Sequence, residues 1–128
     1  MKDCFAAFDQ GTALTRLGGM PETSPEWNPN PALPGVALKH LVTGKESDGR
    51  FSLHLVRLEP GAEIRRHVHE GNWELHQVIH GSGTLMLEDR EIPYKPGMAA
   101  PLPENEPHAV RAGDDGLGLL AVFSPALL

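Results

Sequence analysis

The chain has 128 residues, enough for one domain with a hydrophobic core. Its 17 acidic and 11 basic side chains give a formal net charge of −6 at pH 7, and Arg65-Arg66 is the only adjacent basic pair, so nucleic acid is not an expected partner. A single cysteine, Cys4, excludes an internal disulfide framework, and the apolar run at residues 5–8 is too short for a signal peptide or a membrane span, so we expect a soluble, cytoplasmic protein.

The first 35 residues show little periodicity. Five prolines between positions 21 and 34 disfavour a helix in this region. We expect residues 1–35 to form an arm that packs on the rest of the chain, with residues 20–35 extended and Trp27 as an anchor. A ligand contact by Trp27 is an equally open interpretation.

From residue 36 onward, short apolar runs alternate with turn residues. Strands are predicted at residues 36–43, 51–58, 62–69, 73–80, 84–87, 98–102, 108–111 and 117–123. Turns are predicted at 44–49, 59–61, 81–83 and 113–116, with a polar hairpin tip at 88–91. Many short strands, twelve prolines and fourteen glycines argue against a helical bundle. The pattern predicts an all-β, antiparallel sandwich or barrel over residues 36–128.

Most of the candidate metal-binding residues lie in one segment, residues 61–81, with the sequence GAEIRRHVHEGNWELHQVIHG. Side chains two apart on a strand share a face, so His67 and His69 aim two imidazoles at one point. Glu74 on the next strand and His108 further along could reach the same point. Three imidazoles and one carboxylate suit a borderline divalent metal, which would also compensate polar groups that are costly to bury. Surface histidines on a solvated strand are the alternative.

Three further side chains are candidates for a cavity. His76 lies two residues past Glu74 and could donate a hydrogen bond to a substrate oxygen or act as a general acid or base. The alternative is that its ring only donates a hydrogen bond to a backbone carbonyl. Arg65 could meet a carboxylate or phosphate of a substrate, or form a surface ion pair. The strand pattern does not determine whether His54 points into the barrel or toward solvent.

At these residues the chain resembles the cupin superfamily. The first cupin motif is a Gly, five residues, His-x-His, three or four residues, Glu, six residues and Gly. Every position is matched, by Gly61, His67, His69, Glu74 and Gly81.

The second cupin motif is a Gly, five residues, Pro-x-Gly, two residues, His, three residues and Asn. Gly97, Pro103 and His108 match it. Asn105 stands where the motif has its second Gly, and Ala112 stands where it has Asn. Asn tolerates a positive φ, so we expect Asn105 to preserve the turn.

The resemblance implies a small single-domain bacterial cupin with an antiparallel double-stranded β-helix, the jelly-roll or cupin β-barrel. It implies that His67, His69, Glu74 and His108 hold a divalent transition metal (Fe, Mn, Ni, Zn or Cu) with one or two coordination positions open. Cupins commonly dimerise, so we expect a homodimer whose interface covers outward apolar side chains such as Phe51, Leu53 and Leu55.

For function we expect a metal-dependent enzyme, dioxygenase- or lyase-like, that acts on a small oxygen-rich or anionic molecule at the ion. In this hypothesis Arg65 orients the substrate and His76 moves a proton. The alternative is a non-catalytic cupin that binds or senses a small molecule, with the metal as an anchor. A third hypothesis is a metal-free, purely structural barrel. Fold and ligand set do not choose between these functions.

Overall fold

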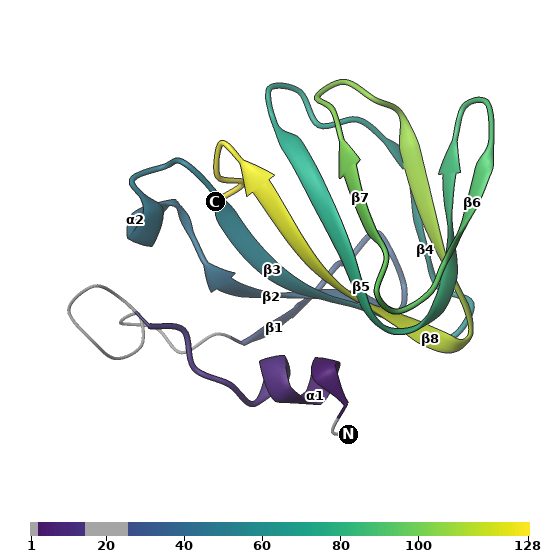
Figure 1. Cartoon of the computed structure of the whole chain (residues 1–128), viewed down its shortest axis with the longest axis horizontal. Coiled ribbons are helices and arrows are strands. Elements are labelled where there is room, and N and C mark those ends of the chain that lie inside the picture. The colour runs from purple at the N-terminus through teal and green to yellow at the C-terminus, as the bar shows by residue number, and fades with distance from the viewer. Residues whose placement is uncertain (1–2, 15–25) are drawn as a thin grey trace.

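The computed structural model describes residues 3–14 and 26–128, and it confirms the antiparallel β-barrel (Figure 1). The described part contains two short helices, α1 (Cys4–Asp9) and α2 (Gly44–Ser47). Its strands are β1 (Trp27–Pro29), β2 (Val36–Val42), β3 (Ser52–Leu58), β4 (Glu63–His67), β5 (Trp73–Leu87), β6 (Glu91–Tyr94), β7 (Ala99–Leu102) and β8 (His108–Ser124). None of the helices in this part is long and apolar enough to cross a membrane.

Two long strands organise the barrel. The hydrogen-bonded order is β1-β2-β3-β8-β5-β6, with β4 paired to β8 and β7 paired to β5, and all pairs are antiparallel. β5 and β8 pair with each other along most of their length and bend, so that β1, β2, β3 and β7 extend one half of the sheet and β4 and β6 extend the other. Between these two halves lies the core, which includes Leu58, Val78, Leu85, Val110 and Leu119.

The predicted turns at 81–83 and 113–116 were wrong, because β5 and β8 run through them. The register shifts between Val78 and His80 and again between Gly81 and Gly83. A Cβ at Gly81 would overlap the carbonyl oxygen of Gly116. The glycines therefore let the two strands approach closely while bending, and do not end them.

The predicted turn at 59–61 is confirmed between β3 and β4, where the Ala62 N–H donates to the carbonyl oxygen of Glu59, but the segment after β2 differs from the prediction. Residues 44–47 form helix α2, where the Thr43 side chain accepts from Lys45 N and the Glu46 carboxylate accepts from Thr43 N, a capping arrangement. The predicted polar hairpin tip is confirmed at residues 88–90, which join the antiparallel strands β5 and β6, and Glu91 already belongs to β6.

The N-terminal segment contains a helix that the sequence analysis missed. All the prolines that argued against a helix lie beyond α1, and the Asp3 carboxylate caps it by accepting from Phe5 N. Trp27 in β1 stacks on Phe5 with a ring separation of 5.9 Å, and its Nε1 donates to Asp9 at 3.0 Å. Residues 20–25 of the predicted extended arm lie outside the described residues.

This N-terminal segment lies against the outer face of the sheet. The Arg57 guanidinium stacks over Trp27 at 4.2 Å, and Phe5 contacts Gly118 of β8. Leu55, which the sequence analysis placed at a dimer face, is fully buried within the single chain. That assignment is corrected, because an alternating strand pattern cannot say which part of the chain covers an apolar face.

Candidate metal centre and pocket

The four residues expected to bind a metal come together at one end of the barrel. His67 ends β4, His69 follows in the next loop, Glu74 lies on β5 and His108 begins β8. One donor atom from each side chain lies within 4.8 Å of the other three. The pairing of His67 with His108 across β4 and β8 joins the two sequence motifs directly.

The donor atoms are spaced as they are around a bound ion. His67 Nε2 lies 3.1 Å from His69 Nε2, and Glu74 Oε1 lies 3.2 Å from His69 Nε2 and 3.3 Å from His108 Nε2. Ligands about 2.1 Å from a metal are about 3.0–3.4 Å from one another. These three spacings therefore suit a transition-metal ion.

Backbone carbonyls fix the tautomers of two of the rings. His67 Nδ1 lies 2.7 Å from the carbonyl oxygen of Arg65, and His108 Nδ1 lies 2.8 Å from that of Glu106. A carbonyl only accepts, so each Nδ1 carries the hydrogen and donates it. Each Nε2 then has a lone pair available toward the cluster, as in metal-binding histidines whose second nitrogen is held by a carbonyl.

Glu74 places a negative charge at the centre of the cluster. Burial opposes ionisation of Glu74, but the rings of His108, His69 and His76 outweigh it and hold the pKa of the carboxyl well below its usual range. Among the described residues, Glu74 Oε1 and His108 Nε2 are buried without a hydrogen-bond partner although they face each other. Two acceptors in this position call for a cation or a proton between them.

His76 holds the other oxygen of Glu74. Its Nε2 lies 3.0 Å from Glu74 Oε2, and its Nδ1 lies 2.9 Å from the Tyr94 hydroxyl. In the tautomer that donates through Nε2 to an ionised Glu74, His76 accepts from Tyr94 through Nδ1. Burial raises the pKa of the Tyr94 hydroxyl, which keeps it a donor. The sequence analysis treated Tyr94 only as packing, and no motif marks its contact with His76.

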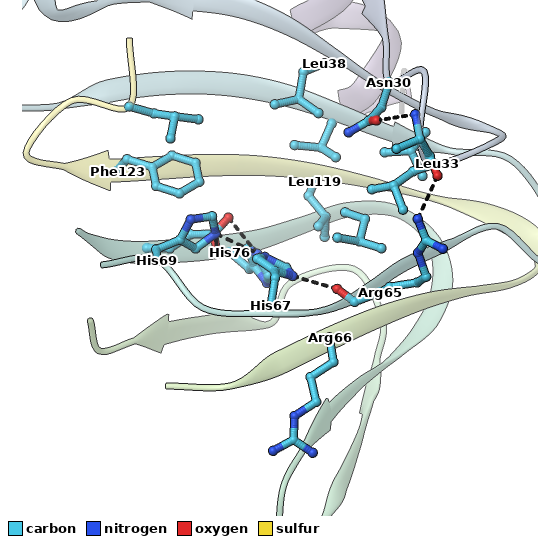
Figure 2. Close-up of a pocket in the computed structure, with 16 residues that line it drawn as sticks. Asn30, Leu33, Leu38, Arg65, Arg66, His67, His69, His76, Leu119 and Phe123 are labelled. Carbon is cyan, nitrogen blue, oxygen red and sulfur yellow. Dashed lines mark hydrogen bonds and ion pairs between the residues drawn. The ribbon is translucent and has the colours of Figure 1, made fainter. Parts of the chain in front are cut away.

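Arg65 has a different environment from the one expected. It lies on the wall of the cavity, but its guanidinium donates to the carbonyl oxygen of Ala32 at 2.9 Å and points away from the histidine cluster (Figure 2). Arg66 lies at the edge of the same cavity and pairs with Glu88. Arg65 thus connects β4 to the segment before β2. Its expected contact with a carboxylate or phosphate of a substrate stays a prediction.

His54 faces inward and is fully buried. Its Nδ1 lies 2.7 Å from His40 Nδ1, and its Nε2 lies 2.8 Å from Ser52 Oγ, which also accepts from Leu127 N. Desolvation and the neighbouring His40 lower the pKa of His54 to about 4, so the ring is neutral near pH 7. The ring of Phe123 lies edge-on to His54 and to His69, between this network and the metal-binding residues.

The departures from the second motif leave the site intact. Asn105 adopts a φ of 65°, which confirms that it replaces glycine in a left-handed turn, and its N–H donates to the carbonyl oxygen of His69. Ala112, where the motif has Asn, is buried and its N–H bonds to Ala62 O. The turn in the second motif thus positions the loop that carries His69.

A cavity of about 420 Å³ opens beside the cluster. His67, His69, Glu74 and His76 line one side of it, whereas His108 lies behind them. Leu38 and Leu119 line the cavity on the other side, and Phe123 lines it next to His69 (Figure 2).

Known proteins with similar sequences share this architecture. The chain is 33% identical over 93 residues to an L-ectoine synthase from Desulfatibacillum aliphaticivorans, covering 71% of this chain and 69% of that protein. It is 27% identical over 90 residues to an oxalate-binding protein from Thermotoga maritima, covering 69% and 74%. The crystal structure of a predicted oxalate decarboxylase from Thermotoga maritima superposes with a TM-score of 0.71 at 26% identity, covering 81% of this chain and 94% of that chain.

The cupin domain model matches residues 54–123, a range that contains both motifs and all four clustered side chains. The fold of solved cupins, the two motifs and the convergence of their histidines and glutamate thus agree. The chain belongs to the cupin domain family, Cupin_2.

Proposed function

We propose that this chain is a metal-dependent cupin enzyme that acts on a small molecule at an ion held by His67, His69, Glu74 and His108. The observation that carries the proposal is the convergence of three Nε2 atoms and Glu74 Oε1 beside an open cavity. Four protein ligands leave one or two positions free on a five- or six-coordinate ion, which a catalytic metal needs.

A bound divalent metal supplies Lewis-acid or redox chemistry to a dioxygenase- or lyase-like reaction. The protein's own residues prepare the site for it. His67 and His108 present preset tautomers, and His76 orients Glu74 through Oε2 while Oε1 faces the cluster. His76 lines the cavity, so proton transfer to or from a ligand there belongs to the same proposal.

The relatives support two candidate functions. Similarity to an L-ectoine synthase favours an enzyme, and similarity to an oxalate-binding protein favours a binding protein in which the metal anchors the ligand. We place the enzyme first because the four metal-binding residues leave an opening to the cavity. The same residues serve both functions, so turnover must decide between them.

The first test is metal content. We expect the untagged protein to retain about one transition-metal ion per chain by elemental analysis. The double substitution His67→Ala and His69→Ala removes two of four ligands and is expected to abolish retention. His80→Ala, an exposed histidine paired with Asp3, is the matched control and should retain the metal. Full occupancy in the double variant would refute the site.

Oxygen uptake on the same metal-loaded sample separates the reactions. Consumption of O₂ with a candidate substrate would support dioxygenase-like chemistry, and substrate loss without O₂ consumption would support a lyase. A ligand that co-purifies tightly and is never converted would support the binding protein.

A further inference from the structure

We propose that the cavity selects ligands with an apolar body and a single oxygen-donor end, and that it disfavours compact dianions such as oxalate. This inference rests on the proposed function, because the oxygen-donor end is to meet the metal held by the four clustered residues. It goes further by naming the chemical class of the ligand.

Apart from Asn30, Arg65 and Arg66, the side chains that line the cavity outside the cluster are apolar. They include Leu33, Leu38, Val56, Ile64, Leu119 and Phe123, which come from four strands and the segment before β2. Figure 2 shows Leu38 and Leu119 on one side and His67 and His69 on the other. A ligand that reaches the cluster must therefore place most of the rest of its surface against hydrocarbon, which favours an apolar body.

The cationic side chains that could hold a second anionic group are directed toward other partners. The lining carries two cationic side chains, Arg65 and Arg66. Arg65 donates to Ala32 O, and Arg66 pairs with Glu88 on the outside of the barrel. The amide of Asn30 is the remaining polar side chain of the lining outside the cluster, and it compensates the desolvation of a second carboxylate less than a guanidinium directed into the cavity would.

At about 420 Å³ the cavity lies within the ~300–1,000 Å³ range of small-molecule sites, so it can hold a ring or a branched chain.

Three hydroxamates test the inference, because they share one chelating head and differ in the body. Acetohydroxamate has almost no body, cyclohexanecarbohydroxamate has an apolar one, and succinic monohydroxamate ends in a carboxylate. We load the protein with Ni²⁺ and measure each dissociation constant by calorimetry, assaying nickel retention afterwards. We expect the cyclohexyl compound to bind at least about tenfold more tightly than acetohydroxamate, and the succinic compound no more tightly than acetohydroxamate.

A variant pair locates the effect in the cavity. Leu38→Asn places an amide in the apolar wall and is expected to reduce the cyclohexyl preference about fivefold or more, with acetohydroxamate binding nearly unchanged. Leu53→Asn changes another half-buried leucine, on the neighbouring strand β3, that does not line the cavity. It controls for general destabilisation and should keep the preference.

The outcomes separate this inference from the proposed function. Nickel binding with equal affinities for the three compounds, or tightest binding of the succinic compound, would overturn the inference and leave the metal site standing. A cyclohexyl preference that Leu38→Asn and Leu53→Asn reduce equally would also overturn it. No nickel retention by the unsubstituted protein would overturn both.

Discussion

Glu74 is the side chain on which the arrangement of the candidate site depends. Its two oxygens have separate roles, because Oε1 faces the Nε2 atoms of His69 and His108 while Oε2 is held by His76. Tyr94 in turn holds His76, so a chain of contacts extends from the barrel core to the cluster. Fixing a ligand from behind in this way raises the metal affinity of a site.

Tyr94→Phe tests that chain of contacts. The substitution keeps the buried ring but removes the hydroxyl that donates to His76 Nδ1. We expect the free energy of unfolding to fall by about 1 kcal/mol and the metal affinity to fall several-fold, because Glu74 is then less firmly oriented. Metal titration and chemical denaturation measure the two effects. Unchanged metal affinity would reduce Tyr94 to a packing residue.

His54 should make the stability of the fold depend on pH. Its pKa is lowered to about 4 in the folded chain, from about 6.5 when exposed. The unfolded chain binds more protons between these values, so the free energy of unfolding decreases as the pH falls through this window, by about 1–2 kcal/mol from His54. Urea denaturation across the window measures it.

His54→Gln is the comparison for this pH dependence. Glutamine can still bond to Ser52 but does not titrate, so the slope of stability against pH between about 6.5 and 4 should become shallower. His40, whose pKa is also lowered by burial, would leave a residual slope. An identical slope in the two proteins would contradict the assignment.

At the scale of elements, the long strands β5 and β8 decide where the site lies. They pair from Trp73 with Ser124 at one end to Leu87 with His108 at the other. This pairing brings Glu74, near the start of β5, close to His108, at the start of β8, because both strands bend across the barrel. Glycines at the bend make that approach possible.

Gly81→Ala tests the bend against a matched control. Gly81 and Gly71 have nearly the same φ, 76° and 78°, but a Cβ at Gly81 would overlap Gly116 O, whereas a Cβ at Gly71 meets open space. We expect Gly71→Ala to cost about 1 kcal/mol from the positive φ alone. Gly81→Ala should cost about 3 kcal/mol or more, because backbone must move. Equal losses in thermal denaturation would show that the close approach is unimportant.

At the scale of the whole molecule, the N-terminal segment covers the outer face of the sheet. β1 pairs with β2, and α1 lies against β3 and β5, on the sheet in which Leu55 and Leu120 are buried outside the central core (Figure 1). Trp27 connects the segment to the barrel through Phe5, Asp9 and Arg57. A homodimer stays a prediction, and light scattering at micromolar concentration tests it.

Trp27→Ala should loosen this cover. The loss of a half-buried indole with its stacking and its hydrogen bond should cost about 1–3 kcal/mol in the free energy of unfolding. Exposure of the face around Leu55 should increase binding of a hydrophobic dye or self-association, measured by fluorescence and light scattering. A variant as stable and as monodisperse as the parent would contradict the role of Trp27.

The sequence by itself determined the β-barrel class, the candidate metal-binding quartet and the left-handed turn at Asn105. These follow from local signals, namely alternation along strands, His-x-His spacing and the backbone preferences of single residues, together with the match to the two cupin motifs. The same local signals misjudged the glycines at 81–83 and 113–116, because a glycine can end a strand or allow two strands to meet, and only the partner strand decides which.

Only the tertiary structure decided what surrounds the quartet. The contact of Tyr94 with His76, the engagement of Arg65 by Ala32 and the burial of Leu55 all join segments far apart in the chain. The apolar wall of the cavity is likewise assembled from several separate strands. Spacing along one strand fixes which side chains share a face, but which other segments meet that face is set by the closure of the whole barrel.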